Sequence, residues 1–233
     1  MEESRIIEVK QDILSHNTHE ADAFRAQLAK KDTLYTDIMA SPGGGKTTLL
    51  LALIRQLRND AAAQGVQEPG IGVIEADLAS DVDAQKIKKA GVVSVELNTK
   101  SICHVDMGMV KSAYRAFDTL SDNFDYLFLE NIGNLVCPAD FDTGAHVRIM
   151  LLSVPEGWDK VMKYPPMFSI VDALVVTKCD YLPLNPDFDM AALKKQARAL
   201  NPNLEIFEVS AKTGEGIDGL TAWVRSRRDV GLA

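Results

Sequence analysis

The 233-residue sequence contains only three cysteines, Cys103, Cys137 and Cys179. Three cysteines cannot build a disulfide framework, so a hydrophobic core must hold the fold and the thiols are left for packing or for metal binding. Long apolar runs are also missing, because no stretch approaches the roughly 18 apolar residues of a membrane span. The first residues lack a charged-then-apolar targeting pattern. We therefore expect a cytoplasmic protein that is not inserted in a membrane.

An excess of basic charge is absent as well. Lys and Arg total 25 against 33 Asp and Glu, which gives a formal net charge of −8 at pH 7. Such a chain has no electrostatic footprint for nucleic acid or for an anionic membrane. No linker rich in Pro, Ser or Gly divides it. The sequence therefore predicts one domain over residues 1–233, with residues 1–30 as a helical extension packed on it.

The most informative stretch is a glycine loop, Ala-Ser-Pro-Gly-Gly-Gly-Lys-Thr-Thr, at residues 40–48. It lies between an apolar run that predicts a strand and one that predicts a helix, which is the context of a phosphate-binding P-loop. Its backbone N–H groups can wrap a phosphate, Lys46 can reach the β and γ oxygens, and Thr47 can bind Mg²⁺. Ala40 stands where the motif usually begins with glycine. The residues predicted to bind the phosphates are Gly43, Gly44, Gly45, Lys46, Thr47 and Thr48.

Short apolar, β-branched runs alternate with helical patterns along the rest of the chain. Strands buried on both faces and separated by helices predict an α/β fold with a mostly parallel, twisted sheet of about seven strands. No convincing helix lies between residues 129 and 147, so an antiparallel direction stays open for one of the two strands on either side of this stretch. Residues 61–70 are expected to form a surface loop. Strands are expected at 34–39, 71–76, 92–97, 126–129, 147–154, 173–176 and 204–209, and helices at 47–57, 82–90, 105–120, 190–200 and 217–228.

Polar residues end several of the predicted strands. In a parallel sheet these ends meet at one edge, where ligands bind. Asp77 and Glu130 can hold Mg²⁺ together with Thr47, and the N–H of Gly133 can contact the γ-phosphate and sense its loss. We predict Lys46, Asp77 and Glu130 as the catalytic residues.

A second group of strand-end residues predicts the nucleotide base. Asp180 can accept two hydrogen bonds from the N1–H and the amino group of guanine, which adenine does not offer. Lys178 can stack its stem on the base, and the backbone of Ser210, Ala211 and Lys212 can donate to guanine O6. Thr177 replaces the usual Asn of Asn-Lys-x-Asp, and its hydroxyl can supply part of the same bracing. The predicted ligands are GTP and GDP.

The run Glu130-Asn131-Ile132-Gly133-Asn134-Leu135-Val136-Cys137-Pro138-Ala139 is too particular for a generic GTPase switch. It resembles the HypB family, GTPases that assist nickel insertion into nickel–iron hydrogenase. Residues 41–50, 98–106 and 163–168 carry the same likeness, which covers residues 6–223. The resemblance implies a SIMIBI-class G domain and a homodimer promoted by GTP. It also implies a nickel metallochaperone as a partner and a nickel-enzyme precursor as the client.

The resemblance also assigns Cys103, His104 and Cys137 to a nickel or zinc site near the dimer interface. Thiolate and imidazole ligands suit both metals. Because Cys103 precedes a helical segment, we expect its thiol pKa to be lowered. Three ligands leave the coordination incomplete, so a second protomer or water would complete it. Lys100-Ser101-Ile102 departs from the glycines that the resemblance leads us to expect before Cys103.

The remaining candidate ligands have simpler interpretations. His16 and His19 are expected on a solvated helix face, His146 in a structural role, and Cys179 as a small buried side chain. Two alternative functions stay open. One is a related GTPase that serves carbon monoxide dehydrogenase, urease or a cobalamin enzyme, although the Cys-Pro-His arrangement expected for a urease chaperone is absent. The other is a small-molecule kinase, although no arginine-rich lid is evident.

Overall fold

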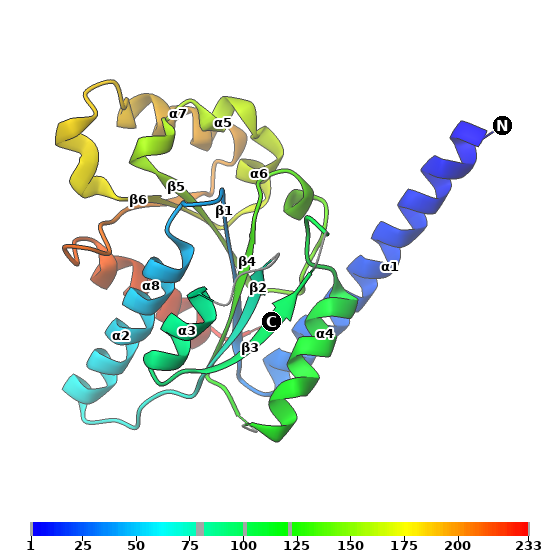
Figure 1. Cartoon of the computed structure of the whole chain (residues 1–233), viewed down its shortest axis with the longest axis horizontal. Helices are drawn as coiled ribbons and strands as arrows, with labels where there is room; N and C mark the ends of the chain where they lie inside the picture. Colours follow the sequence, from blue (N-terminus) through cyan, green and yellow to red (C-terminus); the bar gives the residue numbers. More distant parts are fainter. Residues whose placement is uncertain (1, 78–81, 100–101, 121–122, 233) are drawn as a thin grey trace.

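The computed structural model describes residues 2–77, 82–99, 102–120 and 123–232. A seven-stranded sheet lies at the centre, in the order β3-β2-β4-β1-β5-β6-β7 (Figure 1). The strands are β1 (Leu34–Ala40), β2 (Ile71–Asp77), β3 (Val93–Asn98), β4 (Tyr126–Gly133), β5 (Val147–Ser153), β6 (Ala173–Thr177) and β7 (Glu205–Glu208). Six of the seven predicted strands thus match to within two residues at each end, and β4 continues four residues further, into the polar run that follows it.

Neighbouring strands of this sheet all run parallel. The antiparallel direction considered for the strand that follows residue 129 is therefore wrong, since β5 pairs parallel with both β1 and β6. Its crossover from β4 contains the short turn η2 (Cys137–Ala139) and then a segment without helix or strand, residues 140–146. That segment is hydrogen bonded to α1 (Glu2–Lys30) by Asn17 and Arg25, so α1 lies where a crossover helix usually covers the sheet.

Helices cover both faces of the sheet. Side chains of β1 point alternately to the two faces of the sheet. Leu34 and Ile38 belong to the core on the face covered by α2 (Lys46–Gln64) and α8 (Ile217–Asp229). On the opposite face, Tyr35 packs with α1 and with α4 (Met107–Ala116), and Met39 packs with the helices between Lys160 and Leu200. The helices after α1 are α2 (Lys46–Gln64), α3 (Val82–Lys89), α4 (Met107–Ala116), α5 (Lys160–Lys163), α6 (Pro165–Ile170), α7 (Met190–Leu200) and α8 (Ile217–Asp229). Short 3-10 turns are η1 (Phe117–Thr119), η2, η3 (Val154–Glu156) and η4 (Cys179–Leu184).

Helix α2 is longer than expected. It continues through a run of alanines and ends at Gly65, whose φ of 66° is a left-handed helix cap. The surface loop predicted over residues 61–70 therefore begins only after Gln64.

The N-terminal extension is one helix, α1. Ala21, Phe24 and Leu28 in its C-terminal part are buried against α4 and the sheet. Its N-terminal part extends away from the sheet, as Figure 1 shows. Helices of the described part of the chain are all too short or too polar to cross a membrane. Met1, Lys100, Ser101 and Ala233, which belong to predictions made above, lie outside the described residues.

Candidate nucleotide and metal site

The glycine loop joins the end of β1 to the start of α2, as the sequence predicts. Gly43 and Gly45 have positive φ angles of 75° and 95°. A Cβ on Gly44 would lie 2.8 Å from the Cβ of Ala40 and 3.1 Å from the carbonyl oxygen of Ser41. The loop therefore requires glycine for backbone conformation at two positions and for space at the third. Lys46 begins α2, so the loop lies at a helix N-terminus, where anions are stabilised.

The predicted Mg²⁺ ligands come together beside this loop. The hydroxyl of Thr47 donates a 2.7 Å hydrogen bond to Oε1 of Glu130, and both side chains are buried. Asp77, Glu130 and Gly133 line one cavity of about 250 Å³ together with Lys46. A hydroxyl and two carboxylates are hard oxygen donors of the kind that Mg²⁺ prefers. The side chains present therefore fit a Mg²⁺-bound triphosphate.

Two further residues of this region were not predicted. Glu75 is only 2% exposed, pairs in register with Glu130, and lines the same cavity. It precedes Asp77 by two positions, so strand alternation alone places both carboxylates on one face of β2. Lys86 from α3 lines an adjoining cavity of about 280 Å³ with Lys46 and Thr48. No sequence signal distinguishes Lys86 from the other lysines of α3.

The turn after β5 is also attached to the glycine loop. Nζ of Lys160 donates to the hydroxyl of Ser41 at 2.8 Å and to Glu156 at 2.7 Å. Burial alone would raise the pKa of Glu156, but hydrogen bonds from Lys160 and Ser153 outweigh it and the pKa is lowered. An ionised Glu156 thus holds Lys160 against the loop.

Four of the five predicted guanine-binding residues, all but Ser210, line a cavity of about 200 Å³ beside Gly45 of the loop. Asp180, Lys178, Ala211 and Lys212 all face it, together with Thr48. The hydroxyl of Ser210 donates to Oδ1 of Asp180 at 2.8 Å. This contact holds one carboxylate oxygen in place, and the other oxygen, Oδ2, lies 3.9 Å from Nζ of the exposed Lys212.

The base loop is bonded directly to the phosphate loop. Thr177 donates its hydroxyl to the carbonyl oxygen of Gly44, and Lys178 donates Nζ to that of Gly43, each at 2.8 Å. Lys178 itself has a positive φ of 59°. The bracing that an Asn usually supplies at position 177 is thus present here through a threonine hydroxyl.

Two of the three predicted metal ligands are in contact. The sulfur atoms of Cys103 and Cys137 lie 2.7 Å apart, and the amide of Asn134 donates a 2.9 Å hydrogen bond to the carbonyl oxygen of Cys103. The expected lowering of the Cys103 pKa is wrong, because the contact with Cys137 raises it. The helix end that was expected to lower this pKa is capped instead by Asp106, whose carboxylate accepts from the N–H of Met109 at 2.8 Å.

His104 lies apart from this thiol pair in its contacts. Its ring stacks on Phe141, with centroids 3.7 Å apart and planes 14° from parallel. Burial lowers the pKa of His104, which favours the neutral imidazole that binds metals. Among the residues that the structure describes, no group of three His, Cys, Asp or Glu side chains is close enough to hold an ion. The three-ligand set therefore stays a prediction, with two of its members adjacent.

The other candidate ligands lie where the sequence places them. His16 is exposed and 3.8 Å from Glu20 on the same helix. His146 is structural, since its Nδ1 accepts a 3.0 Å hydrogen bond from the N–H of Tyr35. Cys179 is buried, donates to the carbonyl oxygen of Val176, and has a pKa raised to about 11 by burial.

The fold and the site define a class of protein. A glycine loop between β1 and α2, buried carboxylates at the ends of β2 and β4, and an all-parallel sheet are the features of a P-loop nucleotide-binding domain of the SIMIBI class. A sequence profile described as "CobW/HypB/UreG, nucleotide-binding domain" matches residues 34–208.

The chain belongs to the HypB family. It is 40% identical over 232 residues to hydrogenase maturation factor HypB of Azotobacter chroococcum mcd 1. The matched region covers 100% of this chain and 72% of that protein. It is 38% identical to the Escherichia coli (strain K12) factor of the same name, over 98% of this chain and 75% of that protein. Such relatives do not favour a small-molecule kinase.

A solved structure gives the same result in three dimensions. The structure of HypB from Helicobacter pylori in complex with nickel superposes with a TM-score of 0.83 at 31% identity. The superposition covers 92% of this chain and 96% of that one.

Proposed function

We propose that the protein is a GTP-hydrolysing nickel metallochaperone that assists nickel insertion into a nickel–iron hydrogenase precursor. The observation that carries this proposal is a single segment that lines the phosphate cavity at one end and carries, at the other end, one thiol of an adjacent pair. That segment runs from Glu130, which lines the cavity, to Cys137, whose sulfur touches Cys103. The likeness to hydrogenase maturation factors and to a nickel-bound HypB supports it.

Each residue of the nucleotide site has a task in hydrolysis. Lys46 offsets charge on the β and γ oxygens, and the glycine-loop N–H groups hold the phosphates in line for attack by water. Thr47 and Glu130, with Asp77 in the same cavity, would hold Mg²⁺, which neutralises charge that develops on the phosphates. Asp180 selects guanine through its two acceptor oxygens. The N–H of Gly133 would contact the γ-phosphate and lose that contact on hydrolysis.

The metal is cargo in this proposal. Cys103 and Cys137 supply thiolates, and His104 would supply an imidazole after its ring leaves Phe141. This donor set suits Ni²⁺ and equally Zn²⁺. Because Cys103 is exposed and Cys137 half-buried, the pair is accessible to a metallochaperone that delivers the ion and to a second protomer that completes its coordination. We propose that GTP promotes the homodimer, and that the protein works in the cytoplasm, where GTP and reduced thiols occur together.

One experiment tests these statements together. GTP hydrolysis is measured without any phosphoryl acceptor, and the Ni²⁺ stoichiometry and oligomeric state are measured with GDP and with a non-hydrolysable GTP analogue. The proposal expects hydrolysis to GDP, Ni²⁺ bound through Cys137, and a dimer with the analogue. Hydrolysis only when a small-molecule acceptor is present would overturn it in favour of a kinase.

A further inference from the structure

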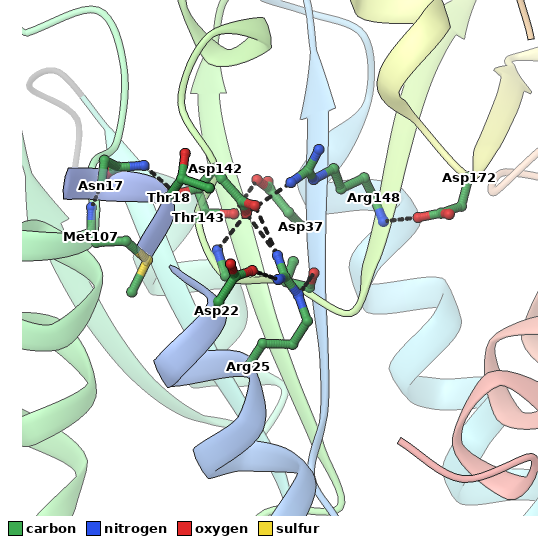
Figure 2. Close-up of polar contacts among 12 residues, drawn as sticks. Asn17, Thr18, Asp22, Arg25, Asp37, Met107, Asp142, Thr143, Arg148 and Asp172 are labelled. Atoms are coloured by element: carbon green, nitrogen blue, oxygen red, sulfur yellow. Dashed lines mark hydrogen bonds and ion pairs between the residues drawn. The ribbon is translucent and has the colours of Figure 1, made fainter. Parts of the chain in front are cut away.

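Helix α1 reaches both thiol-bearing segments through one side chain, Asn17 (Figure 2). Its Oδ1 accepts a 3.0 Å hydrogen bond from the N–H of Met107, the first residue of α4. Its Nδ2 donates a 2.8 Å hydrogen bond to the carbonyl oxygen of Asp142. Met107 follows Cys103 by four positions, and Asp142 follows Cys137 by five. The two segments that carry the thiols touch directly, through the Asn134 bond to Cys103 and the stacking of His104 on Phe141, and Asn17 joins them a second time from outside both.

The Asp142 end of this bridge is firmly held. Its carboxylate accepts from Arg25 of α1 at 2.9 Å and pairs with Arg148 of β5 at 2.8 Å, as Figure 2 shows. It also accepts from the N–H of Gly144 at 2.8 Å. Such charge-assisted bonds fix an orientation more strongly than neutral ones do. The Cys137 segment is therefore attached to α1 and to the sheet at the same point.

We propose that Asn17 is a positioning residue for the metal-binding thiols: its amide sets how the segment of Cys103 and His104 lies against the segment of Cys137. The inference rests on the proposed metal-binding function. Asn17 is 7% exposed, so both halves of its amide exchange water for protein partners. Loss of the first bond leaves the buried N–H of Met107 without its partner, and loss of the second leaves the half-buried carbonyl of Asp142 without its partner, so a movement of the segments becomes favourable. Groups that hydrogen bond directly to metal ligands change affinity about 10- to 100-fold when replaced. Asn17 acts one step further away, so its effect is expected at the lower end of that range.

Two substitutions divide the amide into its parts. Asn17→Asp keeps an acceptor for the N–H of Met107 but loses the donor to Asp142, and Asn17→Leu loses both. Ni²⁺ affinity is measured by competition with a chromophoric chelator, and the thiolate-to-nickel charge-transfer band is recorded. We expect affinity to fall on the order of 10-fold in Asn17→Leu and less in Asn17→Asp, with a changed band.

The matched control is Asn201→Leu. Asn201 follows α7, and its Nδ2 donates to the carbonyl oxygen of Val171 at 2.8 Å, so the substitution removes a similar bond away from the thiols. It should leave Ni²⁺ affinity and the charge-transfer band unchanged. GDP affinity should be unchanged in all three variants, which shows that the nucleotide domain is folded.

A second readout needs no metal. In a glutathione buffer, two thiols and oxidised glutathione exchange to a protein disulfide and two reduced glutathiones, so the equilibrium reports how closely Cys103 and Cys137 are held. Asn17 variants should form less disulfide than the parent at the same glutathione ratio.

If Asn17→Leu does not fold, Asn17→Asp decides the question in both assays. Unchanged Ni²⁺ affinity with an unchanged thiol equilibrium overturns the role of Asn17. Parent Ni²⁺ binding that ignores Cys137→Ala overturns the proposed function, while the thiol equilibrium still tests Asn17.

Discussion

Gly133 touches Pro42 so closely that a Cβ on Gly133 would lie 3.1 Å from three atoms of Pro42. Gly133 ends β4, and Pro42 belongs to the glycine loop that follows β1. The end of β4 therefore packs directly against the phosphate loop, and no side chain of Gly133 separates the two segments. A larger residue at position 133 would push the end of β4 away from Pro42.

Lys46→Ala tests the phosphate site. The substitution removes the charge that faces the β and γ oxygens, so we expect kcat/KM for GTP to fall on the order of 100-fold. Circular dichroism should be unchanged, because Lys46 lines the cavity and is not part of the core. Hydrolysis at the parent rate would contradict the assignment of residues 40–48 as a P-loop.

Asp180→Asn tests the base site. An amide cannot accept both guanine donors, so GTP affinity should fall roughly 10- to 100-fold while affinity for xanthosine triphosphate rises. The bond from Ser210 can persist, since the amide oxygen still accepts it. Nucleotide competition against a fluorescent GDP analogue measures both effects. Equal competition by GTP and ATP in the parent protein would contradict the guanine assignment.

Most of the sheet could be predicted from the sequence, because strands buried on both faces appear as short apolar runs between helical patterns. The direction of β5 could not. Its crossover carries no helical signal, and the cover it needs comes from α1, more than 100 residues earlier in the chain. Local periodicity does not contain such a long-range contact.

The nucleotide site followed from motif order, since parallel strands bring their polar ends together regardless of detail. The Cys103–Cys137 contact was predicted only through the family resemblance. The stacking of His104 on Phe141 and the hydrogen bonds of Asn17 to Met107 and Asp142 depend on how loops pack, which no spacing in the sequence shows.

Cys137→Ala tests the metal site. Losing a thiolate removes a soft ligand, so Ni²⁺ affinity should fall by more than the roughly 10-fold expected for Asn17→Leu. Cys179→Ala is the control, because Cys179 is buried and bonded to the backbone of β6. Equal loss of Ni²⁺ in the two variants would count against the assigned ligands.

Asp37 predicts a pH dependence of stability. Burial raises its pKa from 3.8 to about 6, despite hydrogen bonds from Thr143 and Asn131. The folded state therefore holds a proton that the unfolded chain releases near pH 4. The stability that this group contributes is fully present below pH 4 and is lost as the pH rises to 6 and above. The loss is roughly 3 kcal/mol between these limits.

Asp37→Asn removes this titration. Denaturant unfolding between pH 4 and pH 7 should show a shallower fall in stability for the variant than for the parent. Asp187→Asn, at an exposed position, is the control and should keep the parental slope. Identical slopes in the parent and in Asp37→Asn would show that the buried carboxyl does not titrate in this range.

Nucleotide state and metal affinity should be coupled through β4. Glu130 bonds Thr47 of the phosphate site, Asn131 bonds the buried Asp37, and Asn134 bonds the backbone of Cys103. Residues from one short segment thus contact the nucleotide site, the core and the backbone of Cys103. A movement of this segment on loss of the γ-phosphate would displace Cys103 and Cys137 together or separate them.

Because γ-phosphate and metal then bias the same two-state element, each must change the affinity of the other by an equal factor. A typical coupling of about 1–3 kcal/mol shifts Ni²⁺ affinity roughly 5- to 150-fold between the GDP and GTP-analogue states. Titration of Ni²⁺ into both states measures the shift, and titration of the analogue with and without Ni²⁺ must return the same factor. Asn134→Ala removes the bonds from Asn134 to the Cys103 carbonyl and from the Val136 N–H to Asn134, and it changes none of the residues assigned to the nucleotide site, so it should reduce the factor toward one. Equal Ni²⁺ affinities and equal oligomeric states in the parent would mean that the GTP site and the thiol pair act independently.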